Sequence, residues 1–195
     1  LYSKILLHNW CMQSFWGFVA HRGILNKKWV QYMNTKLLNQ IEQISHKLKL
    51  LQHTVAVAES CTGGLLGAKL TELPGSSDFF VGGVLAYAND MKLNLLNLNP
   101  ETLSTFGAVS QEAASEMASG VLELTDADWG LATTGIAGPG GGSPKKPVGL
   151  VWIGVANKSK VVSQKLSLLG NRSSIRHDAV VAILNTFLGC LNERP

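Results

Sequence analysis

A short apolar run followed directly by a glycine-containing turn is the feature that most limits what this chain can fold into. Residues Thr54–Ala58 read TVAVA, which is typical of a strand buried on both faces. The turn Glu59–Gly64 and a helical pattern over Leu65–Thr71 follow at once. Because a strand buried on both faces needs covering layers above and below it, this segment predicts an α/β protein.

The rest of the chain continues the alternation of strands and helices. Strands are expected at Phe79–Ala88 and Trp129–Thr134, and Val148–Ala156 should pair antiparallel with Lys160–Leu168. Helices are expected at 34–51, from Lys92 to Leu96, from Pro100 after an Asn99 cap, from the Ser110 cap to Leu124, and at 172–191 after an Asn171 cap. The expected fold is one three-layer α/β/α domain with a mixed β-sheet.

The formal net charge of +4 suggests a nucleic-acid binder until its position is considered. Four of the 17 lysines and arginines lie in residues 1–32, which contain no acid, so the other 13 balance the 13 acidic residues. We therefore expect residues 33–195 to form the domain. Residues 1–32 are expected to be an upstream or artificial extension before a natural start at Met33, with an interfacial or partner-binding arm as the alternative. The apolar stretch in this segment is too short and polar to span a membrane.

Three widely separated cysteines, Cys11, Cys61 and Cys190, exclude a disulfide framework and the usual zinc spacings. The histidines show no metal-ligand spacing either. The chain is thus expected to be cytoplasmic and to bind no metal.

The turn after the first strand is the first candidate site. It presents the Ser60 hydroxyl where a helix begins, and Gly63 and Gly64 allow close approach of a ligand. Amide groups at a helix start suit an anion or an oxyanion. The alternatives are that Ser60 or Thr62 only caps the helix, and that Cys61 is the nucleophile.

The segment Gly82–Lys92 is the second candidate. Tyr87 and Asn89 follow a strand, and Lys92 enters the next helix. A lysine acts as a general base only when burial or nearby positive charge lowers its pKa, and a solvated helix charge is the alternative.

Two further segments complete the set of candidates. The loop in Thr133–Ser143 follows a strand but matches neither the dinucleotide nor the ATP glycine pattern. It is expected to cover a ligand or hold one phosphate, and a long hairpin-like connection is the alternative. Arg172 and Arg176 lie four residues apart on one helix face, which suits a phosphate or carboxylate; two solvated charges are the alternative.

Four blocks of sequence resemble one known family. AESCTGG at 58–64, GGVLAYANDMK at 82–92, TTGIAGPGGGSPKKPVGLVWIG at 133–154 and NRSSIR at 171–176 are similar to the C-terminal domain of CinA, a family that includes the stand-alone nicotinamide-nucleotide amidases of the PncC type. The resemblance runs from about residue 37 to 192. Lys145 and Asn171 depart from the usual pattern, which affects expected loop contacts but not the Ser60 and Lys92 positions.

The resemblance implies hydrolysis of the carboxamide of nicotinamide mononucleotide (NMN) to nicotinate mononucleotide and ammonia. It implies Ser60 as nucleophile, Lys92 as general base and Tyr87 in the proton network, without metal or cofactor. The implied substrate-binding residues are Thr62, Gly63, Gly64, Asn89, Ser110, Thr134, Gly135, Arg172 and Arg176.

The expected partners are the nucleotide substrate and further copies of the chain, without nucleic acid or membrane. The alternative function is a non-catalytic nucleotide-binding or competence-related module.

Overall fold

The computed structural model describes residues 35–193. The chain forms two compact units, Leu1–Asn39 and Gln40–Pro195. Of the first unit only the helical residues 35–39 are described. The expected domain boundary between residues 32 and 33 lies outside the described part of the chain, and the fold described below belongs to the second unit.

A five-stranded mixed sheet forms the middle layer, in the order β2-β1-β3-β4-β5. Strand β1 is parallel to both of its neighbours, β2 and β3, whereas β4 is antiparallel to both β3 and β5. The strands are β1 (Val55–Glu59), β2 (Phe80–Leu85), β3 (Trp129–Gly135), β4 (Leu150–Asn157) and β5 (Val161–Ser167). All five residues of β1 are buried, as its apolar composition predicts.

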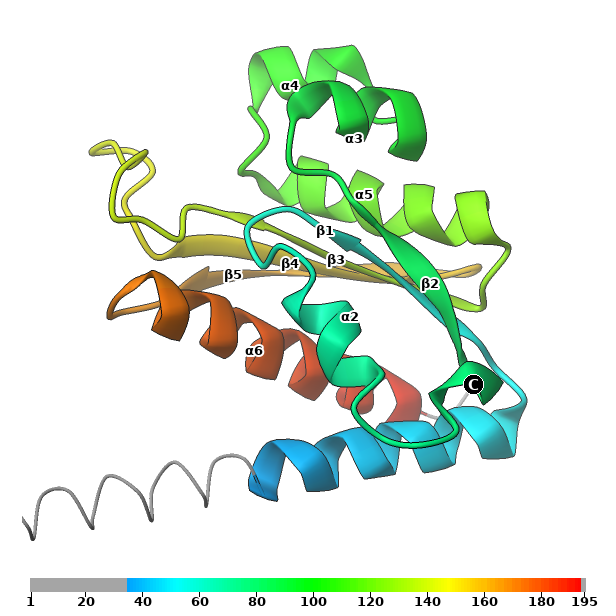
Figure 1. Cartoon of the computed structure of the whole chain (residues 1–195). Coiled ribbons are helices and arrows are strands. Elements are labelled where there is room, and N and C mark those ends of the chain that lie inside the picture. The colour runs from blue at the N-terminus through cyan, green and yellow to red at the C-terminus, as the bar shows by residue number, and fades with distance from the viewer. Residues whose placement is uncertain (1–34, 194–195) are drawn as a thin grey trace, which may run out of the picture. The chain divides into compact units, whose positions relative to one another are not determined.

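Helices cover both faces of this sheet, so the expected three-layer α/β/α fold is confirmed. In Figure 1, α3, α4 and α5 lie on one face, and α2 and α6 lie on the other. The helices are α2 (Leu65–Leu70), α3 (Asn89–Leu96), α4 (Pro100–Thr105), α5 (Gln111–Thr125) and α6 (Arg172–Asn192), with a 3₁₀ turn η1 (Ser76–Asp78) and a first helix over 35–51. Gln40 Nε2, in the first helix, donates to Asn185 Oδ1 of α6 at 2.7 Å.

The predicted helix caps are confirmed. The side chains of Asn99, Ser110 and Asn171 accept hydrogen bonds from the first turns of α4, α5 and α6. The predicted second strand, Phe79–Ala88, is too long, because β2 ends at Leu85. The chain then turns, and Lys92 Nζ donates to the carbonyls of residues 86 and 87. In a longer strand, the sheet would have supplied hydrogen bonds to this part of the backbone instead.

Glycines let α5 approach the sheet until backbone touches backbone. A Cβ added to Gly130 of β3 would lie 2.0 Å from the Ala118 carbonyl oxygen of α5, and one added to Gly154 of β4 would lie 2.4 Å from that of Ala114. Both helix positions are themselves small, fully buried alanines. The helix α5 therefore packs directly against the backbone of β3 and β4.

We predict that Gly130→Ala lowers the free energy of unfolding by about 1–3 kcal/mol, because the new methyl group must displace α5 backbone. Gly189→Ala is the matched control, since Gly189 is an exposed position of α6 with no atom within 4 Å of an added Cβ. This control should stabilise the protein by up to about 1 kcal/mol through helix propensity. Urea titration of both variants measures the difference, and an equal effect of the two would contradict the close packing.

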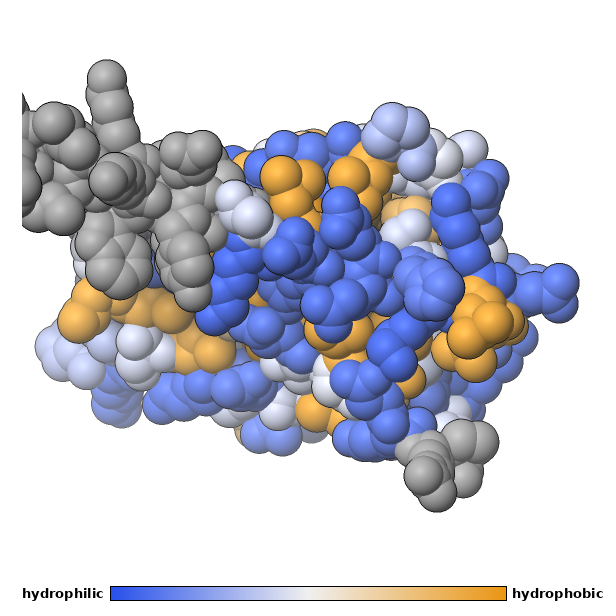
Figure 2. Space-filling model, turned by 90° about the horizontal axis from the view of Figure 1, so that it is seen from below, coloured by the Kyte–Doolittle hydropathy of each residue, from blue (hydrophilic) through white to orange (hydrophobic). Residues whose placement is uncertain are grey.

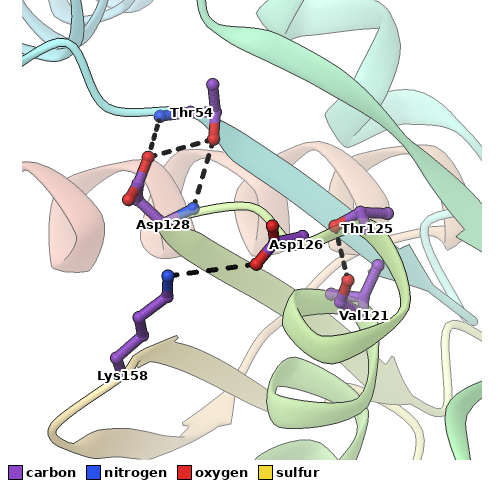
Figure 3. Close-up of polar contacts among 6 residues, drawn as sticks. All are labelled: Thr54, Val121, Thr125, Asp126, Asp128 and Lys158. Carbon is purple, nitrogen blue, oxygen red and sulfur yellow. Dashed lines mark hydrogen bonds and ion pairs between the residues drawn. The ribbon is translucent and has the colours of Figure 1, made fainter.

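Thr54 and Asp128 join β1 to β3 where the two parallel strands begin (Figure 3). Asp128 Oδ2 accepts from the Thr54 amide at 2.8 Å and from its hydroxyl at 3.1 Å, and the Asp128 amide donates back to the Thr54 hydroxyl. Burial alone would raise the pKa of Asp128, but the two hydrogen bonds from Thr54 and the charges of His53 and Lys158 outweigh it and hold that pKa below its ordinary value.

We predict that Asp128→Asn lowers the free energy of unfolding by about 1 kcal/mol at pH 7, a value reduced from that of a buried charged hydrogen bond by solvent screening. The lowered pKa means that the carboxylate stabilises the fold above the unfolded-state pKa of about 3.9 and loses this effect as the pH falls through the folded-state pKa. The difference in the free energy of unfolding between the wild type and the variant should therefore be smaller at pH 3 than at pH 7. A difference that does not shrink as the pH falls would contradict the role of the charge.

The face seen from below in Figure 1 carries mostly polar side chains. Figure 2 shows this face as predominantly hydrophilic, with separate apolar islands instead of one continuous apolar surface. No helix within residues 35–193 combines the length and apolarity needed to cross a lipid bilayer.

Candidate active site

The four sequence blocks converge at one edge of the sheet, where the parallel strands β1, β2 and β3 end. Glu59 is in register with Leu85 of β2 and Thr133 of β3. Ser60, the next residue, continues this pairing by donating its amide to the Thr133 carbonyl at 2.9 Å. On the other side of β1, β2 ends at Leu85, the partner of Glu59, and Ala86 follows directly. The half-buried Ser60 therefore lies between the ends of two neighbouring strands.

Glu59 is a buried carboxylate that organises the turn after β1, and the sequence patterns did not identify it as important. Only 1% of its surface is exposed. Oε2 accepts from the Thr62 hydroxyl at 2.6 Å and from the amides of Gly64 and Leu66 at 3.0 Å, and Oε1 accepts from the Gly67 amide at 2.8 Å. These donors stabilise a charge that would otherwise be costly to bury. A carboxylate six residues before an apolar helix, with two glycines between them, is the signal that could have revealed it.

This arrangement corrects one expectation about the turn. The amide of Gly64 donates to Glu59, and the amide of Gly63 donates to the Ser60 carbonyl at 3.2 Å, so neither is free for an oxyanion. Among the backbone hydrogen bonds of residues 35–193, none is donated by the amides of Cys61 or Thr62. Gly63 and Gly64 instead supply positive φ angles, of 58° and 94°, that a side chain would disfavour.

Lys92 is a buried amine, with only 1% of its surface exposed. Its Nζ donates to the Ala86 carbonyl at 2.7 Å and to the Tyr87 carbonyl at 3.2 Å. Burial holds the pKa of Lys92 below its ordinary value, and the electrostatic interaction with Cys61 opposes this shift. The electrostatic interaction with Cys61, the residue after Ser60, places the amine near the serine turn. The alternative of a solvated helix charge is excluded.

Cys61 differs from Ser60 in its surroundings although the two are adjacent. The Cys61 thiol is buried, and this burial is the main cause that raises its pKa to about 12, with Glu59 adding to the shift and Lys92 and Arg176 opposing it. A thiol with this pKa is not ionised near neutral pH and makes a poor nucleophile. The structure therefore disfavours the alternative in which Cys61 attacks the substrate.

Arg172 and Arg176 have different partners. Arg176 is part-buried, and its Nε and Nη2 both donate to the Thr62 carbonyl, at 3.0 and 2.5 Å. Arg172 is exposed; its Nη1 donates to the Gly138 carbonyl at 2.9 Å and its Nη2 donates to the Tyr87 hydroxyl at 3.2 Å. The first turns of α6 thus connect the serine turn, the tyrosine after β2 and the glycine-rich loop.

The remaining expected substrate-binding residues lie near this edge with mixed exposure. Asn89 is exposed at the start of α3, and Gly135 ends β3. Thr134 is buried and donates its hydroxyl to the Ala108 carbonyl at 2.6 Å. Ser110 is also buried; its hydroxyl donates to the Gly107 carbonyl and accepts from the Ala113 amide. Both hydroxyls therefore have structural partners, and their contact with a substrate stays a prediction.

No group of three or more histidine, cysteine, aspartate or glutamate side chains within residues 35–193 has the arrangement of a metal site. The fold and the site therefore define a class: an α/β protein with a serine, a buried lysine and two arginines at the carboxyl edge of its parallel strands. Residues 38–191 match the family described as the CinA C-terminal domain, and the chain belongs to that family.

Curated relatives agree with this assignment. A competence-damage inducible protein of Thermoanaerobacter pseudethanolicus is 52% identical over 141 residues, which are 71% of this chain and 34% of the relative. A CinA-like protein of Thermosynechococcus vestitus is 55% identical over 130 residues, or 66% of this chain and 31% of the relative. The chain thus spans about a third of the length of these relatives.

Solved structures of similar length have the same fold. The competence/damage inducible protein CihA of Agrobacterium tumefaciens has a TM-score of 0.78 and 40% identity, covering 80% of this chain and 96% of that one. The competence damage-inducible protein A of Klebsiella pneumoniae has a TM-score of 0.78 and 30% identity, covering 82% and 99%.

We predict that Cys61 reacts with iodoacetamide at pH 8 at least about a hundredfold more slowly in the folded protein than in urea, because its raised pKa leaves almost no thiolate. Peptide mapping by mass spectrometry measures Cys61 separately from the other cysteines. Rapid alkylation of Cys61 in the folded protein would contradict the buried, protonated thiol.

Proposed function

We propose that this protein hydrolyses the carboxamide of NMN, giving nicotinate mononucleotide and ammonia, with Ser60 as nucleophile and Lys92 as general base. The observation that carries the proposal is the surroundings of the Lys92 amine. A neutral amine has two hydrogens, and Lys92 has two carbonyl partners, those of Ala86 and Tyr87. With both hydrogens donated, the nitrogen lone pair remains to accept a proton.

The chemistry follows from this arrangement. Lys92 takes the proton of the Ser60 hydroxyl as the oxygen attacks the carboxamide carbon, which forms a C–O bond and a tetrahedral oxyanion. The C–N bond then breaks, and Lys92 returns the proton to the departing ammonia. A water molecule next attacks the acyl-serine, gives a proton to Lys92 and releases nicotinate mononucleotide, after which Ser60 is reprotonated.

Two features support an amide substrate that carries positive charge. The amides of Cys61 and Thr62 have no carbonyl partner in the described part of the chain and are candidate oxyanion donors, and the amide after a nucleophile commonly has this role. A cationic pyridinium ring near Lys92 would further disfavour the ammonium form, in the same direction as burial.

Arg172 is the better candidate for the substrate phosphate. Both arginines use two nitrogens in hydrogen bonds, but Arg176 is part-buried against the Thr62 carbonyl, whereas Arg172 is an exposed residue. The Tyr87 hydroxyl accepts from Arg172 and keeps its own proton to donate, which fits a role in the proton network. The cytoplasmic location and the homo-oligomer stay predictions.

We predict that Ser60→Ala lowers the rate of ammonia release from NMN by at least about a thousandfold, because the nucleophile is lost. Lys92→Met should cause a comparable loss, since the apolar side chain fills the buried space without a base. Cys61→Ala is the matched control beside Ser60 and should keep its kcat within about threefold. A coupled ammonia assay measures all three.

The same assay separates the competing functions. Retained activity in Ser60→Ala would rule out the proposed nucleophile. A wild-type protein that binds NMN in calorimetry but releases no ammonia would instead support the non-catalytic nucleotide-binding module.

A further inference from the structure

We propose that Glu59 is a positioning residue. Together with Thr133, it holds the Thr62 hydroxyl and thereby orients the Thr62 amide toward the reacting carbonyl. The proposal rests on the proposed function, because it assigns the surroundings of the Ser60 oxyanion. It also changes the expected role of Thr62, from a residue whose side chain contacts substrate to one whose side chain is internal.

The direction of the hydrogen bonds follows from the chemistry of the three side chains. The Thr62 hydroxyl has one hydrogen, and it lies 2.6 Å from Oε2 of Glu59, a carboxylate that only accepts. Thr62 Oγ1 also lies 2.6 Å from Thr133 Oγ1. Since the single hydrogen of Thr62 is used, Thr133 must donate to Thr62. The chain of donors therefore runs from Thr133 to Thr62 to Glu59.

Thr62 is held on two sides by opposite charges. Its hydroxyl is bonded to the Glu59 carboxylate, and its carbonyl accepts two hydrogen bonds from the Arg176 guanidinium. The side chain is fully buried, so it cannot reach a substrate without breaking these bonds. The amide is the one polar group of Thr62 that has no partner within residues 35–193.

The position of the Thr62 amide is therefore set before substrate arrives. Glu59 is fixed in turn by the amides at the start of α2, and Thr133 is fixed by its place in β3, so the group moves as one body with the sheet. Donors that are oriented in advance stabilise a developing oxyanion without further reorganisation. Loss of the Glu59–Thr62–Thr133 chain should therefore reduce kcat and leave substrate affinity unchanged.

The decisive variants differ by one hydroxyl group. Thr62→Val removes the donor to Glu59 at nearly constant volume, and we expect kcat for NMN to fall about ten- to hundredfold with KM changed less than about twofold. Thr62→Ser restores the hydroxyl and should return kcat to within about threefold of wild type. Glu59→Gln should behave like Thr62→Val, and Glu72→Gln, which changes an exposed glutamate paired with Lys69, is its control. Should Thr62→Val fail to fold, Thr133→Val and Thr133→Ser provide the same comparison.

A substrate-independent probe separates this proposal from the proposed function. A fluorophosphonate labels an activated serine by forming a P–O bond and expelling fluoride, and its phosphoryl oxygen needs the same donors as an oxyanion. Ser60 labelling without ammonia release from NMN would reject the amidase activity, while slow labelling of Thr62→Val and fast labelling of Thr62→Ser would still support the positioning role.

Four results would overturn the positioning role. The first is an unchanged kcat and labelling rate in Thr62→Val. The second is a raised KM at constant kcat, which would indicate direct substrate contact by the side chain. The third is equal impairment of the Ser and Val variants. The fourth is a wild-type protein that neither labels at Ser60 nor hydrolyses NMN.

Discussion

The buried carboxylate of Glu59 is the interaction on which the rest of the site depends. A charge at the end of a fully buried strand is tolerated only because four donors from the following turn and helix surround it. In satisfying that charge, the chain must fold into one specific turn, and Ser60 lies at its first position. The same carboxylate accepts from the amides around the start of α2, whereas within residues 35–193 the amides of Cys61 and Thr62 have no carbonyl partner.

Close packing of backbone brings the other residues to this edge. Gly130 and Gly154 let α5 lie directly against β3 and β4, and α6 packs its buried apolar residues on the opposite face. The sheet is consequently held between two rigid layers, and loops that are far apart in the chain meet where β1, β2 and β3 end. The arginines at the start of α6 then contact three of these loops at once.

The basic residues near the candidate site each have a different environment. Lys92 is buried and donates to the Ala86 carbonyl, Arg176 holds the serine turn, and Arg172 is exposed near the tyrosine and the glycine-rich loop. From Met33 onward the basic and acidic residues balance, so the overall charge of the chain says nothing about its ligand. A small anionic substrate suits such a site better than a nucleic acid, which requires an extended basic surface.

Local patterns determined the elements of this protein. Periodicity and capping residues predicted the helices and most strands, and the mixed three-layer fold followed from their alternation, because these signals depend on neighbours a few residues away. The sequence also singled out Ser60, Lys92, Tyr87 and both arginines, whose role in a reaction stays a prediction. Only the tertiary structure decided that the side chains of Glu59 and Thr62 bond to each other inside the protein. It also decided that the backbone after β2 turns to bind the Lys92 amine, and that Arg176 and Arg172 bond to different loops. Those features rest on contacts between distant segments, for which burial and charge pairing leave no periodic trace in the sequence.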